Sequence, residues 1–460
     1  MYRPTIGLEI HAELSTRTKM FCDSANNPDE TRPNVNICPV CTAHPGTLPV
    51  INLAAVRHIL RVGTAIGGTP ADFSEFDRKS YFYPDIPKGY QISQYEHPLI
   101  VGGELSGVAI TRVHLEEDTA RSLHVEGKSL VDFNRAGIPL MELVTEPVIS
   151  DAETAGKFAR ELQLLLRTLG ASEANMEKGE MRVEANVSVS SNKDFGTKVE
   201  VKNLNSFRSV ERAIAFEIRR QTALIEGGGE VVQETRGWNE TKQETFHQRF
   251  KEGSADYRYF PEPDLPKLFL SEIPELSREA IRTSLPELPW ERRARYAALG
   301  LKANDAAFIT ASVERGAFFD SVVREFDGKR KPVALAANYF ISDLAVDPGK
   351  ATPTSFAKLI HLFISQMLSS RGTKDTLLVL VEQGGDPEAI AKERGLIQIH
   401  DSTALTAVVD TVLAREEKAV LEYKGGKQTA LQYLVGKAMK ESGGAGNPNM
   451  LHKLIKEKLD

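Results

Sequence analysis

The chain has 460 residues, of which 41% are hydrophobic and 26% charged, a composition typical of a globular protein with about three domains. Its 57 basic and 63 acidic residues give a formal net charge of −6, which excludes a protein that coats nucleic acid over its whole surface. The start lacks the apolar segment of a signal peptide and no long apolar run predicts a membrane span, so we expect a cytoplasmic chain without membrane contact.

The first predicted strand covers residues 6–13 and has two unlike faces. Side chains alternate between the faces of a strand, so the apolar residues at 6, 8 and 10 share one face. Glu9, His11 and Glu13 share the other. This alternation suits an antiparallel sheet with one face in a core, although a polar strand face most often simply contacts solvent.

Three cysteines follow, at positions 22, 38 and 41, too few for a disulfide framework. Cys38 and Cys41 form a C-x-x-C knuckle. Together with Cys22 and His44 it would supply the four nitrogen and sulfur ligands of a tetrahedral structural zinc. The alternative is three reduced thiols that bind no metal.

Two carboxylates lie in otherwise apolar strand patterns further along the chain. Glu117 has the parity of the apolar positions of its strand, whereas His114 and Glu116 have the other parity. Glu142 is likewise set within an apolar run. Because a buried carboxylate is costly unless it is paired or coordinates a metal, these residues indicate a carboxylate-rich metal site.

Two helices and two more strands complete the first part of the chain. The first helix begins at Ser150, with Glu153 completing a capping box, and the second has apolar residues at helical spacing over 210–225. Strands 182–189 and 198–202 alternate polar and apolar residues. These elements predict an α+β fold.

The last part of the chain changes in character after a proline-rich segment. Six prolines between residues 261 and 289 predict a domain boundary and linker. Residues 291–400 are rich in alanine and leucine at helical spacing, and 401–460 read as a small helical bundle. We therefore predict three domains, 1–290, 291–400 and 401–460, of which the last two are all helical.

The end of the chain is locally basic. Residues 423–460 hold seven lysines against three acids, a net charge of +4. A basic patch on an acidic protein suits contacts with nucleic-acid phosphates, and a solvated lysine-rich helix face is the alternative. No G-x-x-x-x-G-K-[ST] phosphate loop is present, so any ATP would be held by carboxylate-bound Mg²⁺ and basic side chains.

Several long and uncommon motifs run through the chain. They are GLEIH (7–11), FDRKSYFYPD (76–85), PKGYQISQ (87–94), HLEED (114–118), NRAGIPL (134–140), EVKNLNSF (200–207), DYRYFPEPD (256–264) and YLVGKAMK (433–440). Through these motifs the chain resembles, almost end to end, the GatB component of the tRNA-dependent amidotransferase GatCAB. Its last segment resembles the YqeY-like tail of that component.

The resemblance implies a fold and an activity. It implies a cradle, similar to the glutamine synthetase core, that phosphorylates the side chain of Glu-tRNA(Gln) or Asp-tRNA(Asn) with ATP. Ammonia made from glutamine by the amidase component, GatA, would then displace phosphate to give the amide. The implied partners are GatA, the small component GatC, misacylated tRNA and the matching aminoacyl-tRNA synthetase.

The resemblance also implies roles for single residues. Mg²⁺ would bind His11, Glu117 and Glu142, although a histidine ligand also suits Mn²⁺. Glu9 lies beside these ligands, and Glu117 would also take a proton from arriving ammonium. Phosphate contacts are expected of Lys79 and Lys88, and tRNA contacts of Lys437, Lys440, Lys453 and Lys456.

Two departures from the family pattern bear on metals. The usual C-x-C of the zinc site reads Cys22-Asp23-Ser24, so His44 is the substitute for the missing ligand and an empty site is the rival. Glu184 replaces the usual aspartate in its strand.

Two rival functions share part of this pattern. A stand-alone ATP-dependent kinase or ligase acting on a small carboxylate would use the same metal carboxylates and would not need residues 401–460. A non-enzymatic tRNA-binding scaffold would need the basic tail and would not need Glu117.

Overall fold

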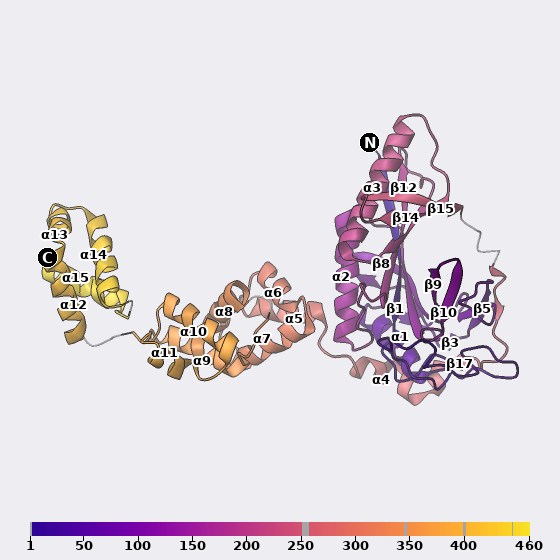
Figure 1. The fold of residues 1–460 in the computed structure, drawn as a ribbon, viewed down its shortest axis with the longest axis horizontal. Helices are drawn as coiled ribbons and strands as arrows, with labels where there is room; N and C mark the ends of the chain where they lie inside the picture. The colour runs from indigo at the N-terminus through magenta and orange to yellow at the C-terminus, as the bar shows by residue number, and fades with distance from the viewer. Residues whose placement is uncertain (1, 251–256, 345–346, 399–401, 444) are drawn as a thin grey trace. The chain divides into compact units, whose positions relative to one another are not determined.

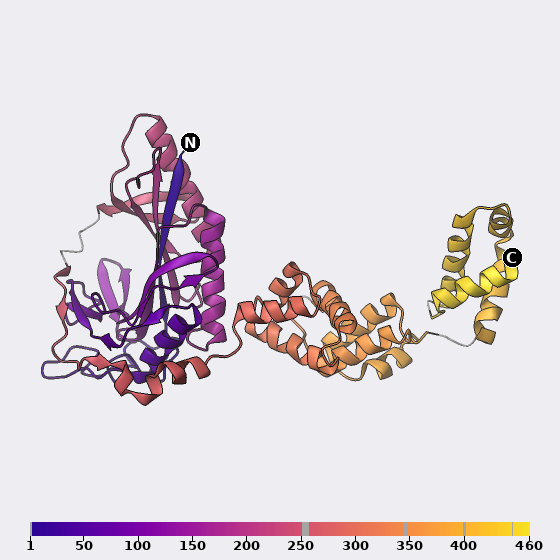
Figure 2. The same ribbon diagram turned by 180° about the vertical axis from the view of Figure 1, so that it is seen from behind.

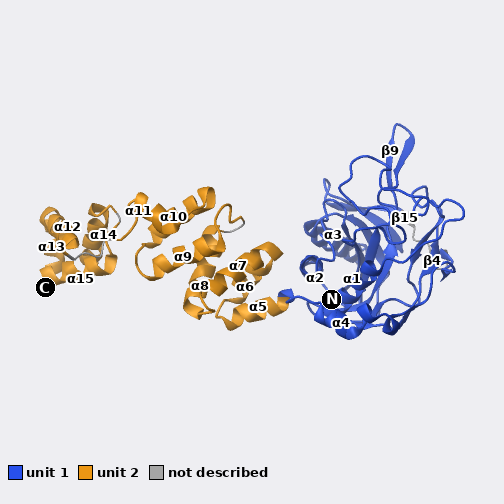
Figure 3. Ribbon diagram, turned by 90° about the horizontal axis from the view of Figure 1, so that it is seen from below, with its two compact units in different colours: residues 1–289 blue, residues 290–460 orange. Residues whose placement is uncertain are grey.

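The computed structural model describes residues 2–250, 257–344, 347–398, 402–443 and 445–460. The chain divides into two compact units, residues 1–289 and 290–460, which Figure 3 colours separately. The first unit is built on a large sheet with helices, and the second unit is helical (Figures 1 and 2). The predicted α+β class is thereby confirmed.

A ten-stranded sheet forms the centre of the first unit, in the order β15-β14-β13-β12-β1-β11-β8-β6-β2, with β7 paired to β8. Its strands are β1 (Arg3–Glu13), β2 (Thr69–Pro70), β6 (Ile100–Val101), β7 (Glu104–Leu105), β8 (Val108–Glu117), β11 (Pro139–Thr145), β12 (Met181–Ser190), β13 (Val199–Leu204), β14 (Glu234–Asn239) and β15 (Glu244–Phe250).

The alternation in the sequence gives this sheet one core face and one polar face. Ile6, Leu8 and Ile10 of β1 are buried on the core face. The sheet is not wholly antiparallel as predicted, because β13 and β14 run parallel. They are joined through a long helix, as parallel neighbours require a crossover connection.

Helices α2 (Ala152–Thr168) and α3 (Phe207–Glu226) pack side by side along one face of the sheet, as Figures 1 and 2 show. Phe158 and Leu162 of α2 are fully buried, and each such side chain contributes about 1.5–3 kcal/mol to folding. The N-cap of α2 is Asp151, which accepts a hydrogen bond from the backbone N–H of Thr154, so the predicted cap at Ser150 was wrong by one residue. A third helix, α1 (Leu53–Ala65), packs near β8.

The smaller elements of the first unit lie on the other side of the large sheet from α2 and α3. They are the pairs β3 (Phe73–Ser74) with β17 (Leu268–Phe269) and β9 (Arg121–Val125) with β10 (Lys128–Asp132), and the sheet of β16 (Phe260–Pro261), β4 (Asp77–Ser80) and β5 (Tyr90–Ser93). In Figure 3, β4 lies on one side of the first unit and the helices α1–α3 lie on the other.

The proline-rich segment is packed against the first unit, in contrast to the predicted linker. It contains β17, the 3₁₀ turns η2 (Leu270–Glu272) and η3 (Pro274–Leu276), and α4 (Arg278–Thr283). Leu268 pairs with Ser74, and Ile281 of α4 is buried. The prolines lie among these short elements, so the predicted linker is a folded segment, although the division between the two compact units does fall at its end, after Pro289.

The second unit holds two hydrophobic clusters among its described residues. One extends from Tyr296 to Ala391, and the other from Leu405 to Ile455. The helices are α5 (Pro289–Ala298), α6 (Ala303–Thr310), α7 (Val313–Glu325), α8 (Arg330–Tyr339), the π-helical turn η4 (Phe340–Leu344), α9 (Pro353–Ile364), α10 (Ser370–Gln383), α11 (Pro387–Glu393), α12 (Ser402–Arg415), α13 (Glu417–Lys424), α14 (Gln428–Glu441) and α15 (Pro448–Leu459). Among the described residues, no helix is both long enough and apolar enough to cross a bilayer.

Candidate active site

The polar face of the large sheet carries a group of acids and histidines that strand register brings together. His11 on β1 lies opposite Glu142 on β11, and Glu142 lies opposite His114 on β8. On the other side of β1, Glu9 lies opposite Glu184 of β12. Residues that are far apart in sequence therefore become direct cross-strand neighbours.

The side chains of this group are close enough to share one cation. His11 Nε2 lies 3.5 Å from Glu142 Oε2, 3.6 Å from Glu116 Oε1 and 3.9 Å from Glu9 Oε1. His114 Nε2 lies 3.4 Å from the same Glu142 oxygen. We call Glu9, His11, His114, Glu116 and Glu142 the carboxylate–histidine cluster.

Within this cluster, two sets of three residues have ligand atoms all within 4.8 Å of one another. Both sets contain Glu142, one with Glu9 and His11 and the other with His114 and Glu116. The chemistry of these donors fits a divalent cation, since hard cations favour carboxylate oxygens and imidazole suits Mn²⁺.

Charges inside the cluster shift its protonation equilibria. Burial lowers the pKa of His11, but the hydrogen bond and negative charge of Glu142, with the charge of Glu116, raise it to about 9. Burial raises the pKa of Glu142, but the two histidines outweigh it and hold that pKa well below its usual range. Burial and the charge of Glu142 raise the pKa of Glu9. The cluster without metal therefore holds a protonated imidazole between carboxylates.

Metal binding by this cluster should release protons, because a coordinating imidazole must be neutral. With its pKa at about 9, His11 is protonated at pH 7 and loses this proton when an ion binds. We expect the apparent Kd for Mn²⁺ to fall about tenfold per pH unit from pH 7 to 9 and to level off above. Calorimetry in buffers of different ionisation enthalpy should find about one proton released per ion at pH 7. Release equal in wild type and His11→Asn would contradict this assignment.

The ammonium group of Lys79 lies near the cluster and comes from the small sheet of β16, β4 and β5. Lys79 lies on β4, and its Nζ is 5.1 Å from the centre of the Tyr257 ring. Burial lowers the pKa of Lys79, but the negative charges of Glu116 and Glu142 outweigh burial and raise it, so the side chain stays charged. A positive side chain beside a group of carboxylates that could hold a metal ion can bind an anionic group such as phosphate.

Glu117 lies apart from the cluster, although it was predicted as a ligand with His11 and Glu142. Its carboxylate forms an ion pair with Lys88 and accepts a hydrogen bond of 3.0 Å from the backbone N–H of Ile92. Adjacent residues of β8 face opposite ways, so Glu116 joins the cluster and Glu117 does not. The structure likewise places Lys88 beside Glu117.

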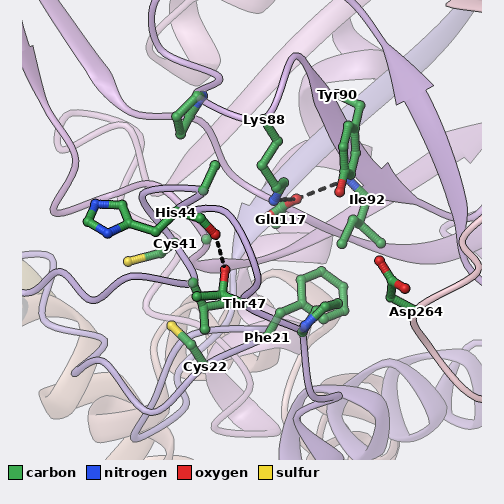
Figure 4. Close-up of a pocket in the computed structure, with 15 residues that line it drawn as sticks. Phe21, Cys22, Cys41, His44, Thr47, Lys88, Tyr90, Ile92, Glu117 and Asp264 are labelled. Atoms are coloured by element: carbon green, nitrogen blue, oxygen red, sulfur yellow. Dashed lines mark hydrogen bonds and ion pairs between the residues drawn. The ribbon is translucent and has the colours of Figure 1, made fainter.

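The pair of Glu117 and Lys88 lines a pocket of about 240 Å³ (Figure 4). Figure 4 shows this pair on one side and the sulfur atoms of Cys22 and Cys41 on the other. Gly137, which also lines the pocket, has φ +84°, a conformation that favours glycine, and any Cβ there would lie 3.9 Å from Glu117. The pocket is therefore lined by the buried carboxylate of Glu117 and the amine of Lys88.

The cysteine knuckle brings three sulfur atoms together without the predicted fourth ligand. Ligand atoms of Cys22, Cys38 and Cys41 lie within 4.8 Å of one another, and His44 does not belong to this group. The buried Lys19 places its Nζ 3.6 Å from Cys41 Sγ. A hydrogen bond from Cys22, with Lys19, lowers the pKa of the Cys41 thiol to about 4. Three sulfurs do not complete the four-ligand set of a closed structural zinc site.

Chelation should therefore have little effect on the stability of the chain. A closed structural zinc contributes folding free energy directly, whereas the Lys19–Cys41 contact needs no metal. We expect the Tm in excess EDTA to stay within about 2 °C of the untreated value. Differential scanning calorimetry with metal analysis of the same sample measures this. One tightly held zinc per chain, with a large fall in Tm on its removal, would contradict it.

The four lysines predicted to contact tRNA lie on α14 and α15. Lys440, Lys453 and Lys456 are exposed, whereas Lys437 is partly buried with its Nζ 2.7 Å from Glu416 Oε1.

Several site residues were not predicted as functional. His114 and Glu116 share one parity in the sequence, which could have found them once β8 and β11 were known to be neighbours. Arg112 also belongs to this face, with Nη2 3.5 Å from Glu142 Oε1. Lys202 donates to Glu184, and no sequence signal placed their strands side by side.

The chain matches two family models. Residues 4–273 match the GatB/GatE catalytic domain, and residues 317–459 match the GatB domain. The first match contains every residue of the carboxylate–histidine cluster and the pocket of Glu117. The second contains the four tail lysines.

Relatives match this chain over nearly all of its length. The B subunit of an aspartyl/glutamyl-tRNA(Asn/Gln) amidotransferase of Thermus thermophilus is 45% identical over 100% of this chain and 99% of its own length. Its counterpart in Synechocystis is 41% identical over 99% and 97%. The B subunit of a chloroplastic/mitochondrial glutamyl-tRNA(Gln) amidotransferase of Physcomitrium patens is 42% identical over 100% and 86%.

Proposed function

The chain belongs to the GatB family of tRNA-dependent amidotransferase components, and on this premise we propose that it uses ATP to amidate amino acids carried by tRNA. The substrate would be Glu-tRNA(Gln), Asp-tRNA(Asn) or both. The side-chain carboxylate would take the γ-phosphoryl group of ATP, and ammonia would then displace phosphate to form the amide.

The observation that carries this proposal is the carboxylate–histidine cluster with Lys79 beside it. Glu142 Oε2 lies 3.5 Å from His11 Nε2 and 3.4 Å from His114 Nε2, so both imidazoles face the same carboxylate oxygen. Ser93 Oγ lies 3.1 Å from Glu116 Oε2 and fixes that carboxylate from β5. Such supporting contacts set ligand geometry before an ion binds. Mg²⁺ or Mn²⁺ held there would neutralise phosphate charge during transfer.

Lys79 would hold the phosphate groups in this scheme. Its amine faces Glu116 and Glu142 and retains its charge. A point charge of this kind binds phosphate oxygens and stabilises the charge that moves to the leaving oxygen. The same arrangement would bring the acceptor carboxylate toward ATP by offsetting the repulsion between two anions.

Glu117 and Lys88 would act in the second step. Ammonium is no nucleophile, so a proton must leave before the nitrogen attacks the phosphorylated side chain. Glu117 is buried and paired with Lys88 in the pocket, where it can accept that proton. We therefore assign Glu117 to ammonium and not to the metal.

Further parts of the proposal rest on the family. Ammonia would come from glutamine through the amidase GatA, with the small GatC in a heterotrimer, and the matching aminoacyl-tRNA synthetase would supply the tRNA. The likeness of the first unit to the glutamine synthetase core belongs here as well. Lys437, Lys440, Lys453 and Lys456 would contact tRNA phosphates.

The test is reconstitution with GatA, GatC, ATP, Mg²⁺ and each misacylated tRNA. Transfer of the γ-phosphate and formation of the amidated aminoacyl-tRNA are measured separately. We expect both, and we expect no activity on free glutamate. Activity on a small carboxylate after removal of residues 401–460 would favour the stand-alone kinase, and tRNA binding without phosphate transfer would favour the scaffold.

A further inference from the structure

The ammonium group of Lys79 differs from those of nearby lysines in the kind of partner it has. Among the residues that the structure describes, its Nζ forms no hydrogen bond and no ion pair. Lys88 and Lys202, by contrast, each donate to a glutamate of the first unit. A lysine ammonium has three donors and no acceptor, so those of Lys79 remain available to a ligand.

An aromatic ring takes the place that a carboxylate has beside the other lysines. Lys79 Nζ lies 5.1 Å from the centre of the Tyr257 ring. This is within the distance of about 6 Å at which the face of an aromatic ring attracts a cation. A carboxylate would cancel the charge of the ammonium, whereas a ring carries no net charge. The contact therefore holds Lys79 without neutralising it.

The segment that carries Tyr257 is fastened to the strand of Lys79. Its residues 260–261 form β16, which pairs with β4. Arg78, the neighbour of Lys79 on β4, donates from Nε and Nη2 at 2.7 Å to the two oxygens of Glu262. The side chain of Glu262 is fully buried, and such a bidentate pair fixes the direction of both groups. Tyr257 and Lys79 are thus carried by two segments that are tied together.

Neighbouring tyrosines fix the ring itself. Tyr259 is stacked on Tyr95, with ring centres 4.2 Å apart and planes at 12°. The Tyr257 ring packs edge-on between two others, with its centre 6.1 Å from that of Tyr259 and 6.1 Å from that of Tyr81. Aromatic pairs at such distances favour this geometry. The position of the Tyr257 ring is therefore set by its aromatic neighbours and does not depend on Lys79.

We infer that Tyr257 is a positioning residue, whose ring holds the Lys79 ammonium near the carboxylate–histidine cluster and leaves its charge and its N–H groups for an anionic ligand. The inference rests on the proposed function in that this ligand is a phosphate group of ATP. Tyr257 acts through Lys79 and does not itself touch the reacting atoms.

The test is a double-mutant cycle, measured as single-turnover γ-phosphate transfer by the full chain with GatA, GatC and misacylated tRNA. We expect Tyr257→Leu to lower the rate by about 2- to 30-fold, and Tyr257→Phe, which keeps the ring, to stay within about twofold of wild type. In the slower Lys79→Met chain, Tyr257→Leu should cost nothing further, because the side chain that it holds is absent. Phe308→Leu is the matched control, since it removes a ring 4.4 Å from Arg315 Cζ in the second unit, and it should match wild type.

Fluorinated phenylalanines at position 257 separate the charge of the ring face from its shape. Each added fluorine weakens the attraction for a cation and changes the size of the ring little, so the rate should fall with the number of fluorine atoms. Equal rates for phenylalanine and its fluorinated forms would overturn the inference. Tyr257→Leu that slows the Lys79→Met chain as much as it slows wild type would overturn it as well.

Failure of the proposed function gives a different result. A Lys79→Met chain that transfers phosphate at the wild-type rate would remove the proposed phosphate contact, and this inference with it. Slow Lys79→Met together with Tyr257→Leu at the wild-type rate would keep that contact and overturn the role of Tyr257 alone. Thermal unfolding shows that each variant is folded.

Discussion

Glu142→Gln should abolish γ-phosphate transfer while the chain still binds tRNA. Glu142 belongs to both ligand sets of the cluster and contacts both histidines. The glutamine side chain of the variant has no negative charge, so both ligand sets lose the carboxylate that they have in common. Stabilisation by a metal ion is worth several kcal/mol, and about 1.4 kcal/mol corresponds to a factor of ten in rate. We expect transfer to fall by about 10³-fold or more.

The measurement is single-turnover transfer of labelled γ-phosphate, with tRNA binding followed in parallel. Glu104→Gln is the matched control, because Glu104 is an exposed glutamate of the same sheet, on β7. Its rate should equal that of wild type. Transfer that survives in folded Glu142→Gln within about threefold would remove the cluster from the reaction, since even supporting residues of metal sites usually cost about tenfold or more.

Glu117→Gln should separate the two half-reactions. The pairing of Glu117 with Lys88 lies outside the metal cluster, so phosphate transfer should stay within about threefold of wild type. Formation of the amide should fall by about 10²–10⁴-fold, the usual contribution of a positioned base. Raising the pH in the presence of an ammonium salt should restore much of the rate of amide formation, because more of the ammonium is then already ammonia and needs no base.

Glu116→Gln is the matched comparison, since it changes the adjacent residue on the other side of β8. It should lose phosphate transfer and gain nothing from high pH or ammonium salt, because its carboxylate lies 3.6 Å from His11. A Glu117→Gln chain that loses phosphate transfer together with Mn²⁺ binding would return Glu117 to the metal, as the family resemblance first implied. Equal, unchanged activity of both variants would mean that the site lies elsewhere.

Much of the fold could be predicted from period-two and helical patterns. The structure has the predicted strand of Glu9 and His11 and the predicted helix over 210–225. Each buries one face, so its apolar residues recur every second residue in the strand and every three to four residues in the helix. The parallel pairing of β13 and β14 could not be predicted, since alternation gives the faces of a strand and not its neighbours.

The site was predictable in the same partial way. His11 and Glu142 were chosen correctly as neighbours, but through the family resemblance and not through register. The parity of Glu117 already separated it from Glu116, and this physical signal agrees with the structure better than the ligand role carried over from the family. The prediction for His44 relied on its position three residues after Cys41. Nearness in sequence was not enough, because His44 does not belong to the group that the three sulfur atoms form.

At the end of β8, two adjacent glutamates face opposite sides of the strand. Glu116 faces the carboxylate–histidine cluster, and Glu117 faces Lys88 and the pocket, so two unlike surroundings are separated by a single peptide unit. One inserted or deleted residue in this strand would exchange the faces of the two glutamates without changing either residue type. The length of β8, and not its composition alone, therefore decides which glutamate faces the cluster and which faces the pocket.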